Sequence, residues 1–110
     1  MSTVVMESKL VDESLSVVVS FLSRLAVGET VQTTAVVASL ASGTDATPSA
    51  ILSGVGTITG ADVSQRVIGG LAGNIYMLTF SIRTSANNIY INRARVAVLS
   101  NTTVTPAAFP

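Results

Sequence analysis

The stretch Ile75–Leu99, IYMLTFSIRTSANNIYINRARVAVL, decides the fold of this chain. Its apolar side chains recur at every second position, which is the period of a half-buried β-strand. One face of the first half carries Tyr76, Leu78, Phe80 and Ile82, and one face of the second half carries Tyr90, Asn92, Ala94, Val96 and Val98. We therefore expect two strands, Ile75–Arg83 and Ile89–Leu99, joined by a hairpin loop over residues 84–88.

Strand signals continue toward the N-terminus. Val, Ile and Thr make up 36 of the 110 residues, and these β-branched side chains favour a pleated surface. Further strands are expected over Asp12–Ser20, Glu29–Leu40, Ala50–Ile58 and Val63–Ile68, with Met1–Met6 as either a short edge strand or an arm. About seven strands with short links predict an all-β, antiparallel immunoglobulin-like β-sandwich.

The connections between these strands show turn chemistry. The segment Asp12–Leu22 also fits helical spacing, but its serines and valines have modest helix propensity, so a strand followed by a tight turn through Ser23–Gly28 is favoured. Ala41–Ser49 combines Gly, Asp and Pro and is expected to be a loop. Gly54 and Gly56 inside a strand indicate a bulge or a close backbone approach. We expect one domain over residues 1–110, with an N-terminal arm over about 1–9 and a C-terminal tail over about 101–110.

The chain carries few charges. Charged residues make up 11% of the sequence, and the six basic residues balance the six acidic ones; an average soluble domain has about 25%. Serine and threonine, 27 in all, replace the missing charges. Zero net charge argues against binding nucleic acid through a basic face. The chain contains neither Cys nor His, which excludes disulfides, Cys-ligated zinc and the usual general base of enzymes.

No targeting or membrane segment is expected. Glu7, Asp12 and Glu13 precede the first apolar run, where a secretory signal would carry positive charge. That run, Leu15–Val27, contains several serines and an arginine, and it is shorter than the roughly 20 apolar residues that span a membrane. We therefore expect a protein without an export signal and without membrane contact.

Several residue groups invite a chemical interpretation, and each has a simpler structural one. The glycine-rich Gly69–Gly73 lacks the following helix and lysine of a phosphate-binding loop, so a turn is favoured. Asp45 and Asp62 lack the spacing of a calcium loop and fit solvated turns. Glu7, Asp12 and Glu13 lie close together in the sequence, but a small sandwich has no evident cleft across which two carboxylates could act on a substrate. The only lysine, Lys9, has no serine three residues before it, so a Ser-Lys nucleophile is absent. No catalytic, cofactor-binding or metal-ligating residues are expected.

Two features of the final hairpin concern surface and architecture. Arg83, Arg93 and Arg95 cluster there, with Arg93 and Arg95 on one face, and they fit either a solvated sheet face or a protein interface better than nucleic acid. Tyr76 follows a glycine-containing turn at the start of the penultimate strand, which is typical of the tyrosine corner of sandwich folds. Its hydroxyl is expected to bond backbone around residues 70–72.

The order of the turn and strand motifs along the chain is similar to that of a known class of phage proteins. These motifs are Asp12–Leu15, Phe21–Ser23, Gly28–Val31, Ser42–Asp45, Pro48–Gly54, Val63–Val67, Gly69–Tyr76 and Thr84–Ser85. Over roughly residues 10–98, the chain resembles small immunoglobulin-like structural proteins of tailed bacteriophages, in particular the fibre–tail adaptor proteins.

This resemblance implies a non-enzymatic virion component that needs no cofactor. Such a protein would be synthesised in the bacterial host cytoplasm and would sit in the tail or neck as a homo-oligomeric ring, linking a tail hub or nozzle to fibres or spikes. The neutral composition agrees with this, because charges are depleted at the cores of protein interfaces. The candidate contact segments are Met1–Met6, Ala41–Ser49 and Asn101–Pro110.

Other functions remain open on sequence grounds. A capsid decoration protein on the phage head would have the same fold and differ in copy number. A small ligand-binding or carbohydrate-binding module is less favoured, since it needs exposed aromatic side chains and aromatics make up only 5% of the sequence. An enzyme lacks visible machinery, and we expect neither a nucleic acid nor a small-molecule substrate as a partner.

Overall fold

The chain is an all-β sandwich of seven strands, as the sequence predicts. The computed structural model describes residues 5–100, with side chains from Ser8 onward. The strands are β1 (Val5–Leu10), β2 (Leu15–Ser20), β3 (Val31–Ser42), β4 (Leu52–Thr59), β5 (Asp62–Val67), β6 (Ile75–Thr84) and β7 (Ile89–Leu99). Two short 3₁₀ turns, η1 (Leu22–Arg24) and η2 (Pro48–Ile51), lie between strands. Within the described residues, no helix is long and apolar enough to cross a membrane.

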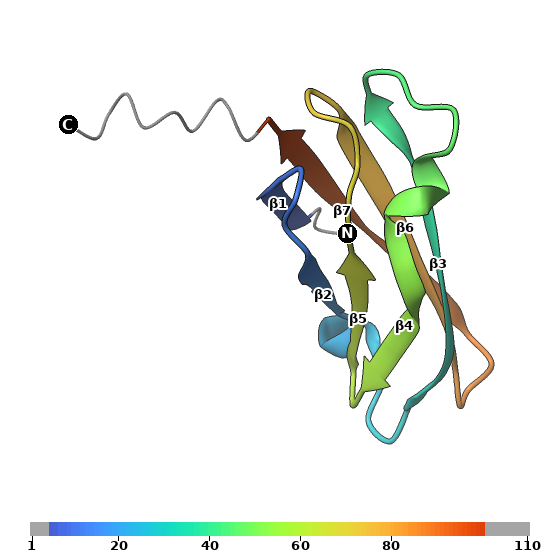
Figure 1. Cartoon of the computed structure of the whole chain (residues 1–110). Coiled ribbons are helices and arrows are strands. Elements are labelled where there is room, and N and C mark those ends of the chain that lie inside the picture. The colour runs from blue at the N-terminus through green and yellow to red at the C-terminus, as the bar shows by residue number, and fades with distance from the viewer. Residues whose placement is uncertain (1–4, 101–110) are drawn as a thin grey trace.

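The strands form two sheets that pack face to face (Figure 1). One has the order β1-β7-β6-β3 and the other has the order β2-β5-β4. All neighbouring strands are antiparallel except β1 and β7, which run parallel. Apart from the position of β1, this division into sheets is that of the immunoglobulin fold.

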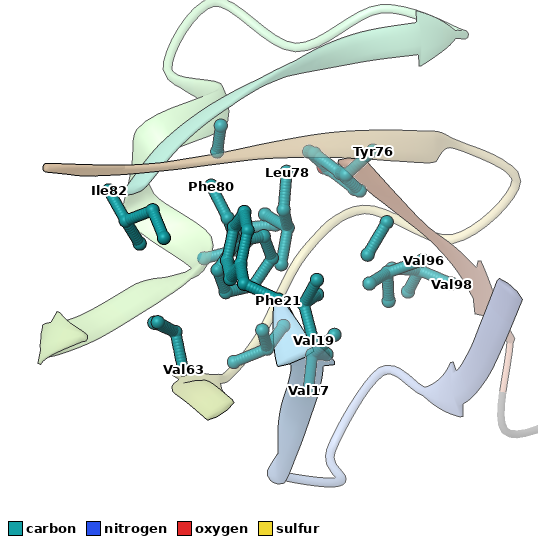
Figure 2. Close-up of a cluster of buried hydrophobic side chains, with 14 residues drawn as sticks. Val17, Val19, Phe21, Val63, Tyr76, Leu78, Phe80, Ile82, Val96 and Val98 are labelled. Carbon is teal, nitrogen blue, oxygen red and sulfur yellow. The ribbon is translucent and has the colours of Figure 1, made fainter. Parts of the chain in front are cut away.

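The core lies between the inner faces of the two sheets. Figure 2 shows valines from β2 and β5 meeting the large side chains of β6 and the valines of β7, with Phe21 between them. The alternation in β6 is complete: Tyr76, Leu78, Phe80 and Ile82 are all buried, as expected. Because burial of a large apolar side chain contributes about 1.5–3 kcal/mol, this strand anchors the four-stranded sheet to its partner.

The N-terminal segment is more integrated than an arm. Residues 5–9 of the expected arm lie in β1, which pairs with β7 in the register Val5↔Ala94 through Leu10↔Leu99. The chain then crosses to the other sheet through a turn in which Glu13 N–H donates to the carbonyl of Leu10 and Glu13 Oε1 accepts from Leu10 N–H at 2.7 Å. Residues 1–4 and the expected tail over 101–110 lie outside the described residues.

Several strand boundaries differ from the predicted ones by two or three residues. The second strand begins at Leu15, because residues 11–14 form the crossing turn. The strand expected over Glu29–Leu40 is shifted to Val31–Ser42, since pairing with β6 continues to Ser42↔Ile75 and so takes two residues from the expected 41–49 loop. The next strand begins at Leu52, since Pro48 opens a 3₁₀ turn. The register of β4 shifts between Ser53 and Thr57, which confirms the expected bulge.

Candidate functional site: the outer face of the four-stranded sheet

The outer face of the four-stranded sheet combines apolar and basic side chains. Strand β7 places six residues on it: Ile89, Ile91, Arg93, Arg95, Ala97 and Leu99. Their partners across the β6–β7 ladder include Arg83, Ser81, Thr79 and Met77. Ile89 is 59% exposed and Ile91 is 40% exposed, so neither belongs to the core. A sheet face that only meets water usually carries polar side chains, so exposed isoleucines are unusual there.

The three arginines of the final hairpin share this face. Arg93 and Arg95 lie two residues apart on β7, and Arg83 pairs with Ile89 further along the same ladder. All three are exposed. Arg83 donates a hydrogen bond to Asn87 Oδ1 at 2.7 Å, whereas Arg93 and Arg95 have no hydrogen-bond or ion-pair partner among the described residues. The expected sharing of a face by Arg93 and Arg95 is confirmed, and pairing adds Arg83 to it.

A shallow hollow lies at one end of the face. It has a volume of about 190 Å³ and is bordered by β3, β6 and the start of β7, including Thr33, Ala35, Ser81, Arg83 and Ile89. A second hollow of about 290 Å³ lies between β3 and the bulged part of β4, near Gly54 and Gly56. The first hollow makes the outer face of the four-stranded sheet, hereafter the arginine-bearing face, concave around Arg83 and Ile89.

Lys9, the only lysine, has a structural environment that sequence reasoning missed. It is 1% exposed and donates hydrogen bonds to the carbonyls of Leu10 (2.8 Å), Val11 (3.1 Å) and Gly69. Burial lowers its pKa from the ordinary value, while the charges of Glu13 and Asp12 partly oppose this. The side chain therefore ties the end of β1 to the loop between β5 and β6. The sequence carries no clear signal of this burial, because Glu7 and Lys9 are both charged and occupy equivalent alternate positions of the segment that forms β1.

The tyrosine corner is present, and it includes an acidic residue. The hydroxyl of Tyr76 accepts from Leu71 N–H at 2.9 Å, within the expected region, and donates to Asp45 Oδ2 at 2.7 Å. Asp45 also accepts from Thr47 N–H, and these hydrogen bonds, that from Thr47 first, lower the pKa of its carboxyl. Asp45 is therefore a structural residue and not only a solvated turn residue. Its spacing from Thr47 is the signal for this Asx-type turn.

A second acidic residue closes the opposite end of the sandwich. Glu29 accepts hydrogen bonds from Ala26 N–H, Thr84 Oγ1 and Asn88 Nδ2, and these lower the pKa of its carboxyl. The carboxylate joins the β2–β3 loop to the β6–β7 hairpin. Its role is to hold two loops together.

The remaining candidates from the sequence are dispersed. Gly69–Gly73 leads into strand β6, as the turn interpretation requires, and a side chain at Gly70 would meet Val98 Cγ2 at 2.9 Å. Asp62 begins β5, far along the chain from the Asp12–Glu13 turn. Within residues 8–100, no three His, Cys, Asp or Glu side chains are grouped to hold a metal ion. The exposed part of Ala41–Ser49 flanks the tyrosine corner.

Comparison with known proteins places this sandwich in a family. A family model described as podophage GP4 fiber-tail adaptor protein gp77, the Gp77 family, matches residues 9–99. The match includes the end of β1 and all of the other six strands, and with them the whole of the described arginine-bearing face. No curated protein matches the chain.

Proposed function

The chain belongs to the Gp77 family of podophage fiber-tail adaptor proteins, and on this premise we propose that it links the tail of a phage particle to its fibres or spikes. The observation that carries this proposal is the family match over residues 9–99, which spans nearly the entire sandwich. The role is structural: the protein binds neighbouring proteins and holds them in place.

The surface chemistry supports a part that works inside an assembly. Two sheet faces are available, and both expose Ser, Thr and Val side chains; the outer face of the three-stranded sheet is also poor in charge. The three-stranded sheet exposes Val18 (50%) and Val55 (87%), while the four-stranded sheet exposes Val37 (60%) on β3 and two isoleucines on β7. The cores of protein interfaces are depleted in charge, as is the outer face of the three-stranded sheet. We propose that identical copies form a ring in the tail or neck of the virion, with tail hub or nozzle proteins on one side and fibres on the other.

The loop over Ala41–Ser49 is proposed as one contact segment of the ring. Its residues 41–44, 46, 47 and 49 are exposed at one end of the sandwich. The hydrogen bonds of Asp45 and Asn74 hold the loop in shape, since Asn74 Nδ2 donates to the Thr44 carbonyl at 2.9 Å. A preformed loop loses little conformational entropy on binding. The terminal segments 1–6 and 101–110 are proposed as further contacts on the basis of the sequence.

The test is quantitative mass spectrometry of purified phage particles. An adaptor ring predicts about a dozen copies or fewer in each particle, as expected of a closed cyclic assembly. Hundreds of copies would instead identify a decoration protein of the head. A chain that is absent from purified particles and stable as a free monomer would overturn the proposal.

A further inference from the structure

We propose that the outer face of the four-stranded sheet, defined by Arg83, Arg93, Arg95, Ile89 and Ile91, binds a different virion protein whose matching surface carries carboxylates around a small apolar patch. The inference deepens the proposed adaptor function and rests on it. It assigns a partner chemistry to one of the two sheet faces.

The first argument is the separation of charge on a neutral molecule. Of the six basic residues, three lie on this face, and no acidic side chain that the structure describes lies there with them. The described acidic side chains are in turns or loops, at Asp12, Glu13, Glu29 and Asp45, or at the start of β5, at Asp62. The face is therefore basic although the net charge of the chain is zero.

The second argument is that the arginines are available. Arg93 and Arg95 have no partner among the described residues, and both project from the middle of a paired strand, so their backbone positions are fixed. Arg24, in contrast, already stacks over the Tyr90 ring at 5.0 Å, and Arg66 donates to Ser14 Oγ at 2.9 Å. A guanidinium binds a carboxylate through two parallel hydrogen bonds, which makes carboxylates its matching ligand.

The third argument is the apolar neighbourhood of the arginines. On β7 the two exposed isoleucines precede Arg93 and Arg95 on the same face, and Val37 pairs with Thr79 beside Arg93. Along the strand, Ile89 to Arg95 spans about 20 Å at the usual rise per residue. A nucleic-acid site would need more basic side chains than these three and would have no use for exposed isoleucines. The combination of arginines and isoleucines therefore favours a protein surface as the partner.

A second copy of this chain does not supply the complement through its other sheet. The outer face of the three-stranded sheet places Arg66 beside Ser16, and Asp62 beside Ser20 and Thr59. One carboxylate and one guanidinium on that face do not match three arginines. A different protein is therefore the assigned partner.

The test uses the scarcity of lysine in this chain. A water-soluble carbodiimide condenses an amine with a carboxylate in contact, forming an amide and releasing a urea. The only natural lysine, Lys9, is buried, so the background from side chains is low. Arg93→Lys with Arg95→Lys keeps the charge of the face and adds two amines to it, and Arg66→Lys adds one to the opposite sheet as a matched control. Assembled particles carrying each variant are cross-linked and analysed by mass spectrometry.

We expect cross-links from positions 93 and 95 to Asp or Glu of another virion protein, at least tenfold more abundant than those from position 66. Cross-links only to a second copy of this chain, or none above the position 66 control, would overturn the proposal. If unmodified chain is itself absent from particles, the adaptor function fails first, so the two failures are distinguishable.

Charge reversal gives an independent readout. Arg93→Glu and Arg66→Glu change the net charge equally at exposed positions of paired strands. We expect Arg93→Glu to lower incorporation into particles at least tenfold while Arg66→Glu incorporates normally. Circular dichroism and thermal melting verify that both variants fold. Normal incorporation of a folded Arg93→Glu variant, or DNA binding by the unmodified protein that Arg93→Glu abolishes, would contradict a protein partner at this face.

Discussion

The hydroxyl of Tyr76 joins segments that are far apart in the chain, because it bonds Leu71 N–H and the carboxylate of Asp45. Tyr76→Phe retains the buried ring and removes only this junction. We expect the free energy of unfolding to fall by about 1–3 kcal/mol, the usual cost of leaving buried partners unpaired. Urea denaturation measures the change.

The matched control for that substitution is Tyr90→Phe. The Tyr90 hydroxyl accepts only from Asn88 Nδ2, at 3.3 Å and in an exposed position. Its removal is expected to change stability by less than about 0.5 kcal/mol. Equal losses of unfolding free energy in the two variants would show that the hydrogen bonds of the Tyr76 hydroxyl do not stabilise the fold.

The carboxyl of Asp45 makes stability depend on pH in the acid range. Its pKa in the folded protein lies below the ordinary 3.8, because Thr47 N–H and the Tyr76 hydroxyl donate to it. A lowered pKa means that the folded state favours the ionised form, so the stabilisation is complete above the ordinary pKa and is lost as pH falls through the lowered pKa. We expect the stability advantage of the unmodified protein over Asp45→Asn to be constant above about pH 5 and to close below about pH 4. Denaturation at a series of pH values tests this. A stability advantage that persists at pH 2 would contradict this prediction. In a Tyr76→Phe background the advantage should be smaller, because one hydrogen-bond donor to Asp45 is removed.

At the scale of elements, the two glycines of the β4 bulge are required for different reasons. Gly56 does not have a positive φ, but a Cβ there would lie 3.1 Å from Val36 Cγ2 across the sandwich. Gly54 has open space and a positive φ of +73°. We expect Gly56→Ala to destabilise by about 1–3 kcal/mol through crowding and Val36→Ala to recover part of that loss. Gly54→Ala, which costs about 1–2 kcal/mol through backbone strain, should add to Val36→Ala without recovery. A double-mutant cycle measures both couplings, and identical couplings would refute the distinction.

The attachment of β1 depends on Lys9. Its ammonium donates to three backbone carbonyls, one of them in the distant Gly69 loop. Lys9→Met keeps a side chain of similar length and removes these hydrogen bonds, so local opening of β1 should become easier. We expect faster amide hydrogen exchange in β1 with little change in β3 and β6, and Ser8→Ala at the neighbouring exposed position serves as the control. Unchanged exchange in β1 would show that strand pairing alone holds it.

At the scale of the whole molecule, a neutral protein with one basic face should respond to salt in its binding. Electrostatic contacts at an exposed face weaken as the Debye length falls from about 10 Å at 0.1 M to about 3 Å at 1 M salt. We expect unmodified protein to be released from particles progressively by salt washes. A variant with Arg93→Gln and Arg95→Gln should be retained less at low salt and depend less on salt. Equal salt dependence of the two proteins would place the electrostatic contacts elsewhere.

Much of the architecture follows from local pattern. The alternation in Ile75–Leu99 predicts both strands because side chains of a strand point to opposite faces at every step, whatever the partner strand is. The order of short turn motifs likewise indicates the fibre–tail adaptor family, since each motif is a local feature of the chain. The absence of Cys and His is also a property of sequence alone.

Tertiary structure decided which distant residues meet. The parallel pairing of Val5–Leu10 with β7, the burial of Lys9, the bond from Tyr76 to Asp45 and the joining of Arg83 to Arg93 and Arg95 on one face all depend on strand register. Register is set by the packing of the complete core, because shifting a strand by one residue turns its buried side chains toward solvent. The sequence by itself therefore determined most of the strands and the family, whereas the register of β7 against β6 decided that Arg83 shares a face with Arg93 and Arg95.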